Sequence, residues 1–281
     1  MIEIKTRKIQ TNGYSTSLLE SGNPENDTII FLHGGGPGAT AISNWKNFIP
    51  CFNEQFHVLA PDILGYGYTD HPEEMPKTLA GWMRERVNQV LAMMDELGIE
   101  KAHIAGNSMG GALTMHLLMA APERFDRVSL MGSAGGLSST ATVEVMRMIG
   151  FYKDPTITSF KNLLKWFVYD ESLIGDQLDT IVKERFEEVM RPEVRRSYES
   201  FFAVPPVDFN VPPSALRRID HPVLIAHGRE DRFVLPESSV YLQQYIPNSQ
   251  LHIFDKCGHW VQVERKDSYS KLLLDFFNDE Y

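Results

Sequence analysis

The sequence has few features that tie a protein to a membrane or to an oxidising compartment. Among its 281 residues only two are cysteine, Cys51 and Cys257, and neither belongs to a Cys-x-x-Cys pair. This count excludes a disulfide framework, so we expect reduced thiols. No apolar stretch approaches the roughly 18 residues of a membrane span. Residues 1–20 carry charges where an apolar signal segment would lie. The sequence therefore predicts a soluble, cytoplasmic protein.

Basic clusters, internal repeats and low-complexity segments are also missing. The formal net charge is −10, whereas a protein that binds nucleic acid needs a basic face. We therefore exclude nucleic acid and membranes as partners and expect a small-molecule substrate. The chain is 43% hydrophobic, which suffices for a large core, either in one domain with an insertion or in two domains.

Apolar runs and helix-period segments alternate along much of the chain. We predict strands at 28–32, 56–60, 102–105, 127–131, 223–226 and 250–254, and helices at 79–97, 109–121, 236–245 and 267–277. Alternation of this kind predicts an α/β fold with a mostly parallel central sheet and helices on both faces. Alternating residues at 2–10 and 14–20, joined around Asn12-Gly13, predict an N-terminal hairpin.

The alternation stops at about residue 133, and the next 70 or so residues are helical and rich in large apolar side chains. Gly135-Gly136 marks the entrance of this segment, and Val204-Pro205-Pro206 marks its exit. We interpret residues 134–207 as a helical cap, or lid, inserted into a core domain formed by 1–133 and 208–281. Ordinary core helices are the alternative, because amphipathic helices bury one face in either case.

The most informative motif is Gly-Asn-Ser-Met-Gly at 106–110. It follows the apolar run at 102–105 and precedes the helical stretch at 111–121. A strand that turns sharply into a helix presents the central serine, Ser108, as a nucleophile on a strained turn. Cys257 is a rival nucleophile, but a small buried thiol is the simpler interpretation of that residue.

A serine hydroxyl needs a base, and the base needs an acid that fixes its tautomer. Hydrolases with this strand–turn–helix nucleophile supply them in the chain order serine, acid, histidine. The loop at 227–232 offers Asp231, with Glu230 as the less favoured alternative. The loop at 257–260 offers His259, which follows a glycine just after the last predicted strand. We therefore predict Ser108, Asp231 and His259 as the catalytic residues.

Negative charge that develops on a carbonyl oxygen during attack needs preorganised N–H donors. The backbone N–H of Met109, at the start of a helix, is the first candidate. The second is Gly35 or Gly36 in the loop HGGGPG at 33–38, which follows a predicted strand. A phosphate-binding loop would require Gly-x-x-x-x-Gly-Lys-Ser/Thr, and that pattern is absent, so we interpret the loop as part of an oxyanion hole.

Together these elements resemble the α/β-hydrolase superfamily over nearly the whole chain. Within it, HGGGPGA at 33–39, SNW at 43–45, GNSMGG at 106–111 and KCGHW at 256–260 resemble the meta-cleavage product hydrolases. The resemblance implies hydrolysis of a carbon–carbon bond in 2-hydroxy-6-oxo-hexa-2,4-dienoates, compounds that form when aromatic rings are opened. The implied products are 2-hydroxypenta-2,4-dienoate and a carboxylic acid.

The resemblance also implies which residues bind the substrate. Asn44 and Asn107 resemble polar groups that hold the carboxylate and hydroxyl end of the dienoate. Without the resemblance, asparagines in loops equally well satisfy backbone groups. Arg185 resembles a cap-helix arginine that pairs with the carboxylate, with Arg191 as the alternative. A guanidinium suits this task because it can form a bidentate pair of hydrogen bonds. Trp260 resembles an aromatic wall next to the base.

The implied mechanism requires no metal or organic cofactor, and the resemblance suggests a homodimer or higher homo-oligomer. The dienol is first ketonised, and Ser108, with His259 as base, then adds to the ketone carbonyl. Cleavage expels a dienolate, and water releases the acyl group. A gem-diol route remains an alternative.

A serine carboxylesterase is the nearest rival function, since the same residues cleave esters. A proline iminopeptidase has a similar glycine loop but needs an acidic site for an amino terminus. Dehalogenases and epoxide hydrolases use a carboxylate nucleophile, whereas residue 108 is serine. A non-catalytic ligand-binding protein of the same fold is a further alternative.

Overall fold

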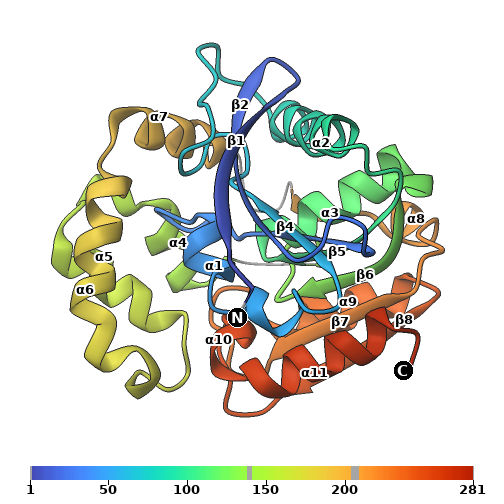
Figure 1. Ribbon diagram of the computed structural model, residues 1–281. Coiled ribbons are helices and arrows are strands. Elements are labelled where there is room, and N and C mark those ends of the chain that lie inside the picture. Colours follow the sequence, from blue (N-terminus) through green and yellow to red (C-terminus); the bar gives the residue numbers. More distant parts are fainter. Residues whose placement is uncertain (1, 138–140, 204–208, 281) are drawn as a thin grey trace.

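The computed structural model describes residues 2–137, 141–203 and 209–280. In this part of the chain, eight strands form a single sheet, which lies at the centre of the protein (Figure 1). The order across the sheet is β1-β2-β4-β3-β5-β6-β7-β8. β2 pairs antiparallel with both β1 and β4, and all other neighbours are parallel. The strands are β1 (Lys5–Thr11), β2 (Tyr14–Ser21), β3 (Thr28–Leu32), β4 (His57–Pro61), β5 (Ala102–Asn107), β6 (Phe125–Met131), β7 (Val223–Gly228) and β8 (Ser249–Phe254).

Helices cover both faces of the sheet, because successive side chains of a strand point to opposite faces. In β3, Ile30 and Leu32 belong to the core under α2, α3 and α9, whereas Ile29 and Phe31 belong to the core under α1 and α11. The helices of these two layers are α1 (Ala41–Trp45), α2 (Leu79–Glu96), α3 (Met109–Ala120), α8 (Pro213–Leu216), α9 (Pro236–Tyr245), α10 (Val261–Glu264) and α11 (Lys266–Phe277), with short 3-10 turns at Ile49–Cys51 and Pro122–Arg124.

The predicted α/β fold is confirmed, and the predicted elements are present. The strand expected at 28–32 and the helix expected at 236–245 have the predicted bounds. Other bounds differ by a few residues; for example, the strand predicted at 102–105 extends to Asn107. The predicted hairpin is β1–β2, and its turn residues Asn12 and Gly13 have φ angles of 49° and 85°.

A second group of helices, the insert, lies between β6 and β7 in the chain and at one side of the sheet (Figure 1). Its elements are α4 (Val143–Ile149), a 3-10 turn at Phe151–Lys153, α5 (Ile157–Trp166), α6 (Ser172–Val189) and α7 (Pro192–Phe201). The exit predicted at Val204-Pro205-Pro206, and with it the domain boundary at 207/208, lies outside the described residues. So do the ends of the predicted core, residues 1 and 281.

The junction between β5 and α3 is a tightly constrained turn. Ser108 has φ 55° and ψ −115°, a conformation that side-chain-bearing residues rarely adopt. A Cβ atom at Gly106 would lie 2.4 Å from the carbonyl oxygen of Gly110, and one at Gly110 would lie 2.4 Å from that of Leu32. Both glycines are therefore required by the close approach of three backbone segments.

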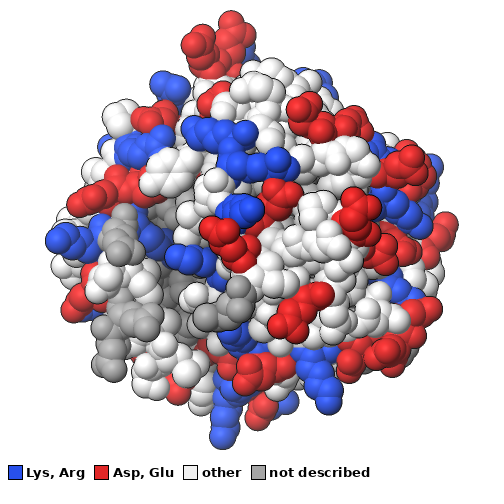
Figure 2. Space-filling model, in the orientation of Figure 1, with Lys and Arg blue, Asp and Glu red and all other residues white. Residues whose placement is uncertain are grey.

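The surface carries charges of both signs. On the face shown in Figure 2, basic and acidic side chains are interspersed over the molecule. No helix in the described part of the chain combines the length and apolar character needed to cross a membrane.

Substituting alanine for Gly106 should destabilise the protein by about 2 kcal/mol or more, because the new methyl group must displace backbone atoms. The matched control is Gly175→Ala, at an exposed position of helix α6, where nothing lies within 4 Å of the added Cβ. We expect the control to stabilise the protein by roughly 0.5–1 kcal/mol. Urea denaturation of both variants measures the difference, and equal stabilities would contradict this account of the turn.

Candidate active site

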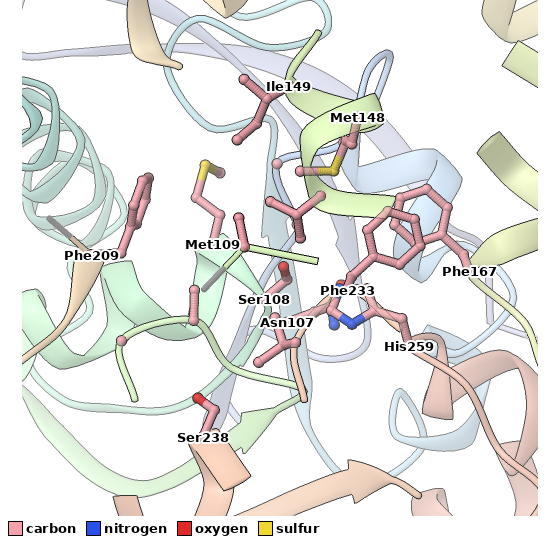
Figure 3. A pocket seen from close by; sticks show the side chains of 18 of the residues that line it. Asn107, Ser108, Met109, Met148, Ile149, Phe167, Phe209, Phe233, Ser238 and His259 are labelled. Atoms are coloured by element: carbon pink, nitrogen blue, oxygen red, sulfur yellow. The ribbon is translucent and has the colours of Figure 1, made fainter. Parts of the chain in front are cut away.

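The predicted site residues meet at the carboxyl ends of the parallel strands. Ser108 follows β5, Asp231 follows β7 and His259 follows β8, while the glycine loop at 33–38 follows β3. Ser108, His259 and the glycine loop border a pocket of about 380 Å³ whose other wall is formed partly by the insert, and Asp231 lies behind His259. Figure 3 shows the side chains of Ser108 and His259 directed into this pocket.

His259 and Asp231 form a short, buried hydrogen bond. The imidazole Nδ1 lies 2.6 Å from Asp231 Oδ2, and both side chains are almost inaccessible to solvent. Asp231 Oδ1 accepts the backbone N–H groups of Phe233 and Val234 at 2.8 and 3.0 Å. Burial alone would raise the pKa of Asp231, but the imidazoles of His259 and His227 hold it well below its usual value. The carboxylate stays ionised, so Nδ1 of His259 carries the proton and Nε2 is free to act as a base.

Glu230, the alternative acid, faces elsewhere. Its Oε2 accepts the backbone N–H of Cys257 at 2.9 Å, and its carboxylate has no hydrogen bond to His259 among the described contacts. Cys257 is buried, and burial raises its thiol pKa, which disfavours the nucleophilic thiolate. The structure thus brings Asp231, and not Glu230, to the histidine.

The glycine loop is held by a buried, neutral histidine. Burial lowers the pKa of His33 to about 4. Its Nε2 accepts the N–H of Ile63 at 2.9 Å, so Nδ1 carries the proton and donates to the carbonyl oxygen of Gly34 at 2.7 Å. In a planar trans peptide, C=O and N–H point in opposite directions. The N–H of Gly35 therefore points away from His33.

Gly35 also lies directly against the start of helix α3. A Cβ at Gly35 would lie 3.1 Å from Met109 Sδ and 3.2 Å from its Cβ. The Tyr66 hydroxyl donates to the Gly35 carbonyl at 3.1 Å. A Cβ at Gly36 would instead lie 3.3 Å from the ring of Phe167. The N–H of Met109 is the first of its helix, where N–H groups lack intrahelical partners.

Both predicted asparagines line the pocket, and both also support backbone. Asn107 Nδ2 donates to the carbonyl of Met131 at 3.1 Å. Asn44 Oδ1 accepts the N–H of Gly34 at 3.4 Å, and its Nδ2 donates to the carbonyl of Thr40 at 3.2 Å. Each asparagine therefore lines the pocket and also holds backbone groups through hydrogen bonds, as the alternative interpretation of the sequence predicts.

The two candidate arginines have different surroundings. Arg185 lines the pocket, and burial lowers its pKa to about 10, so it stays charged at neutral pH. Its guanidinium donates to the Pro37 carbonyl at 3.3 Å, while its buried Nε has no partner among the described residues. Arg191 does not line the pocket. It is paired with Glu188 at 2.6 Å and with Glu193 at 2.7 Å.

A stack of three rings joins the insert to the histidine loop. Phe167 lies between Trp260 and Phe233, with ring centroids 4.7 and 3.9 Å away and nearly parallel planes. The carbonyl of Phe167 accepts the backbone N–H of His259 at 2.8 Å. The insert therefore contacts the predicted base both through its backbone and through an aromatic side chain.

Glu264 strengthens the same junction. One carboxylate oxygen accepts the N–H groups of Tyr169 and Asp170 at 2.8 and 3.1 Å, and the other accepts the N–H of Gly258 at 2.6 Å. Burial raises the pKa of Glu264, and these hydrogen bonds counteract the rise. A single carboxylate thus ties the insert to the residue that precedes the histidine.

No motif in the sequence singles out Phe167, Phe233, Tyr66 or Glu264. Phe167 was visible only as one of many large apolar residues in the insert. Glu264 and Tyr66 belong to no motif, and their partners lie distant in the chain. No local signal in the sequence points to their contacts.

Asp231→Asn tests the role of the acid in fixing the tautomer. The N–H groups of Phe233 and Val234 still need an acceptor, so the new amide nitrogen turns toward His259 and donates to Nδ1. The imidazole proton then moves to Nε2, which no longer accepts the serine proton. We expect kcat for p-nitrophenyl acetate to fall by about 10³- to 10⁴-fold.

The control for this substitution is Glu230→Gln, since Glu230 does not face His259. We expect its kcat to stay within about threefold of the wild type, as for a group that is not in contact with the reacting atoms. Equal losses in the two variants would contradict the assignment.

Comparison with known proteins shows which family the chain belongs to. Residues 27–266 match the family model described as alpha/beta hydrolase fold. The chain is 33% identical to 2-hydroxy-6-oxo-2,4-heptadienoate hydrolase of Pseudomonas putida F1 over 98% of this chain and 96% of that protein. It is 36% identical to 2-hydroxy-6-oxononadienedioate/2-hydroxy-6-oxononatrienedioate hydrolase of Comamonas testosteroni over 90% and 88% of the two chains.

Among solved structures, 2-hydroxy-6-oxo-6-phenylhexa-2,4-dienoate hydrolase of Rhodococcus sp. strain RHA1 superposes with a TM-score of 0.95 at 41% identity. The match covers 99% of this chain and 100% of that one. A meta-cleavage product hydrolase of Pseudomonas fluorescens IP01 superposes with a TM-score of 0.89 at 35% identity, over 98% of both chains. The chain therefore belongs to the α/β-hydrolase superfamily and, within it, to the meta-cleavage product hydrolases.

Proposed function

We propose that this protein is a serine hydrolase that cleaves a carbon–carbon bond in 2-hydroxy-6-oxo-hexa-2,4-dienoate-type products of aromatic ring opening. The products are 2-hydroxypenta-2,4-dienoate and a carboxylic acid. One observation carries the proposal: Arg185, a cation without a carboxylate partner among the described residues, lines the pocket that also contains Ser108.

Arg185 supports an anionic substrate, because a partly buried guanidinium whose N–H lacks an acceptor costs free energy. A bound carboxylate would accept that hydrogen bond and neutralise the charge. Its guanidinium lies 6.0 Å from the ring of Trp260, next to His259, so a carboxylate bound there sits close to the reacting groups. A neutral ester has no group that needs this cation. Asn44 and Asn107, which also line the pocket, would hold the carboxylate and hydroxyl end of the dienoate.

We assign Ser108 as nucleophile, His259 as base and Asp231 as the acid that orients the base. The oxyanion would be held by the N–H groups of Met109 and Gly35. Gly35 is favoured over Gly36 because it packs against Met109, whereas Gly36 faces Phe167.

In the proposed reaction the dienol is ketonised, with a proton placed on the carbon that will leave. The hydroxyl of Ser108 then adds to the ketone carbonyl as His259 takes its proton. Collapse of the oxyanion breaks the carbon–carbon bond and expels the dienolate. Water, activated by His259, releases the acyl group as the acid. In the alternative gem-diol route water itself adds to the ketone, and no acyl-serine forms.

We further propose that residues 134–207 act as a cap that shapes the substrate's distal pocket. Phe209 lies across the pocket from Phe167 in Figure 3, and further apolar lining comes from Val145, Met148, Ile149 and Phe202. Arg185 is the one Lys or Arg among the described lining residues, and Glu237 adds a negative charge. This lining favours a neutral, apolar substituent beyond the 6-oxo group.

The protein is proposed to act in the cytoplasm as a homodimer or higher homo-oligomer. The location rests on the two cysteines, which favour reduced thiols. The oligomeric state follows the resemblance to the family, and light scattering on the purified protein tests it. A serine carboxylesterase remains the alternative function, because the same triad and oxyanion hole cleave esters.

A substrate series tests the proposed function. The 6-methyl, 6-phenyl and 6-(2-carboxyethyl) dienoates share one reacting head, and bleaching of the yellow dienolate band reports cleavage. We expect turnover of the first two and kcat/KM at least about tenfold lower for the dicarboxylate, because its second carboxylate would meet an apolar lining and the like charge of Glu237.

In the same series Ser108→Ala should lower kcat by about 10⁴-fold or more. Absence of bleaching with all three substrates, together with rapid hydrolysis of p-nitrophenyl acetate, would leave a serine esterase. Accumulation of an acyl-serine detectable by mass spectrometry would distinguish the covalent route from the gem-diol route.

Arg185→Met should lower kcat/KM for the dienoate by roughly 10- to 100-fold, the loss of charge-assisted hydrogen bonds. Hydrolysis of neutral p-nitrophenyl acetate should change by no more than about threefold, since that ester has no carboxylate to bind. The matched control is Arg191→Met, since Arg191 is paired with two glutamates outside the pocket. A control variant as impaired on the dienoate as Arg185→Met would refute the assignment.

A further inference from the structure

A second arginine without a carboxylate partner lies behind the pocket, on helix α2. Arg86 is fully buried. Its Nε donates to the carbonyl of Leu64 at 3.2 Å, and its Nη2 has no partner among the described residues. A buried guanidinium that lacks a counter-ion is rare, because desolvating the charge is costly. Such a group calls for a specific explanation.

Three aromatic rings surround this guanidinium. Its central carbon lies 3.9 Å from the ring centroid of Phe201, 4.8 Å from that of Trp82 and 5.3 Å from that of Tyr66. The negative faces of aromatic rings stabilise a cation that has lost its water. Phe201 belongs to α7 of the insert and Trp82 to α2, so the charge is held where the insert meets the sheet domain's helices. Burial lowers its pKa only to about 10, and Arg86 therefore stays charged at neutral pH.

The guanidinium contacts two side chains that adjoin the proposed oxyanion-hole residues Met109 and Gly35. Nη1 donates to Met109 Sδ at 3.2 Å, and this same sulfur packs against Gly35. The Tyr66 ring belongs to the cage, while its hydroxyl donates to the Gly35 carbonyl. The positive charge of Arg86 also acts on the glycine loop. Burial is the main cause of the lowered pKa of His33, and the charge of Arg86 lowers this pKa further.

We propose that Arg86 is a positioning residue of the oxyanion hole, which clamps Met109 against Gly35 and adds a buried positive charge behind the two N–H donors. The inference rests on the proposed serine hydrolysis. In a site of low dielectric, a fixed charge stabilises a developing oxyanion more than it stabilises the neutral carbonyl of the bound substrate. The effect of removing it therefore falls on kcat, with little change in KM.

The alternative is a purely structural role, in which the side chain only fills the space between three rings. That role predicts a change in stability and no change in the chemistry of the folded protein. Two substitutions distinguish the structural role from the electrostatic one. Lysine preserves the positive charge, whereas methionine has a similar length and no charge.

The test compares Arg86→Met and Arg86→Lys by p-nitrophenyl acetate kinetics and by affinity for phenylboronic acid, which binds serine as a tetrahedral anion. We expect Arg86→Met to lower kcat by about 10- to 100-fold, with KM within threefold, and to weaken the boronate by a similar factor. Arg86→Lys should recover most of both losses. If the methionine variant does not fold, Arg86→Gln takes its place as the uncharged variant.

Trp82→Phe is the matched control, because it disturbs the cage and keeps the charge. We expect a lower Tm with kcat within about threefold. A folded uncharged variant with wild-type kcat and wild-type boronate affinity would overturn the proposal, and so would a lysine variant as impaired as the methionine one. Failure of a fluorophosphonate to label wild-type Ser108 would instead remove the proposed function itself, together with this inference.

Discussion

The structure depends on one steric constraint, the crossing of three backbone segments beneath Ser108. The Cβ positions of Gly106 and Gly110 are occupied by neighbouring backbone, and the serine between them is held at a positive φ. This strain is maintained by β3, β5 and α3 together, since no single segment would adopt it alone. Its result is a hydroxyl raised above the sheet edge, with the first N–H of a helix directly behind it.

The remaining parts of the site are built around this fixed point. Asp231 is held by two N–H groups of its own loop, and His259 by the carbonyl of Phe167. On the other side of Ser108, His33 orients a glycine peptide through a single hydrogen bond. Each of these contacts uses backbone or a buried neutral group, so the geometry exists before any substrate binds. Among the described residues, five buried side-chain atoms have no hydrogen-bond partner, and two of them are guanidinium nitrogens, one in Arg185 and one in Arg86.

Local signals in the sequence sufficed for the fold and for the choice of Ser108, Asp231 and His259 as candidates. Apolar runs, glycines at a sharp turn and the order of the three residues along the chain are each readable within a few positions. The choice between Asp231 and Glu230 rested on side-chain length, and the geometry brings Asp231 to the histidine. Strand ends shifted by a few residues, because pairing with neighbouring strands extends them beyond the apolar run.

The features of the site that could not be predicted from the sequence depend on contacts between segments that lie far apart in the chain. Arg185 and Arg191 look alike in the sequence, and it is the fold that brings Arg185, and not Arg191, to the pocket. The contacts of Glu264 and Phe167 join segments nearly 100 residues apart. The aromatic cage of Arg86 draws its rings from three separate segments. Such contacts follow from tertiary packing, which no local pattern encodes.

The bridge from Glu264 to Tyr169 and Asp170 also limits how the insert can be exchanged. Together with the carbonyl and ring of Phe167, it makes residues 167–170 part of the histidine's support. A chimera that takes its insert from a relative must therefore keep the host's 167–170, or bring the donor's histidine loop along with it. The unit that can be recombined among these hydrolases is accordingly not the inserted segment alone, because residues 167–170 and the histidine loop must come from the same parent.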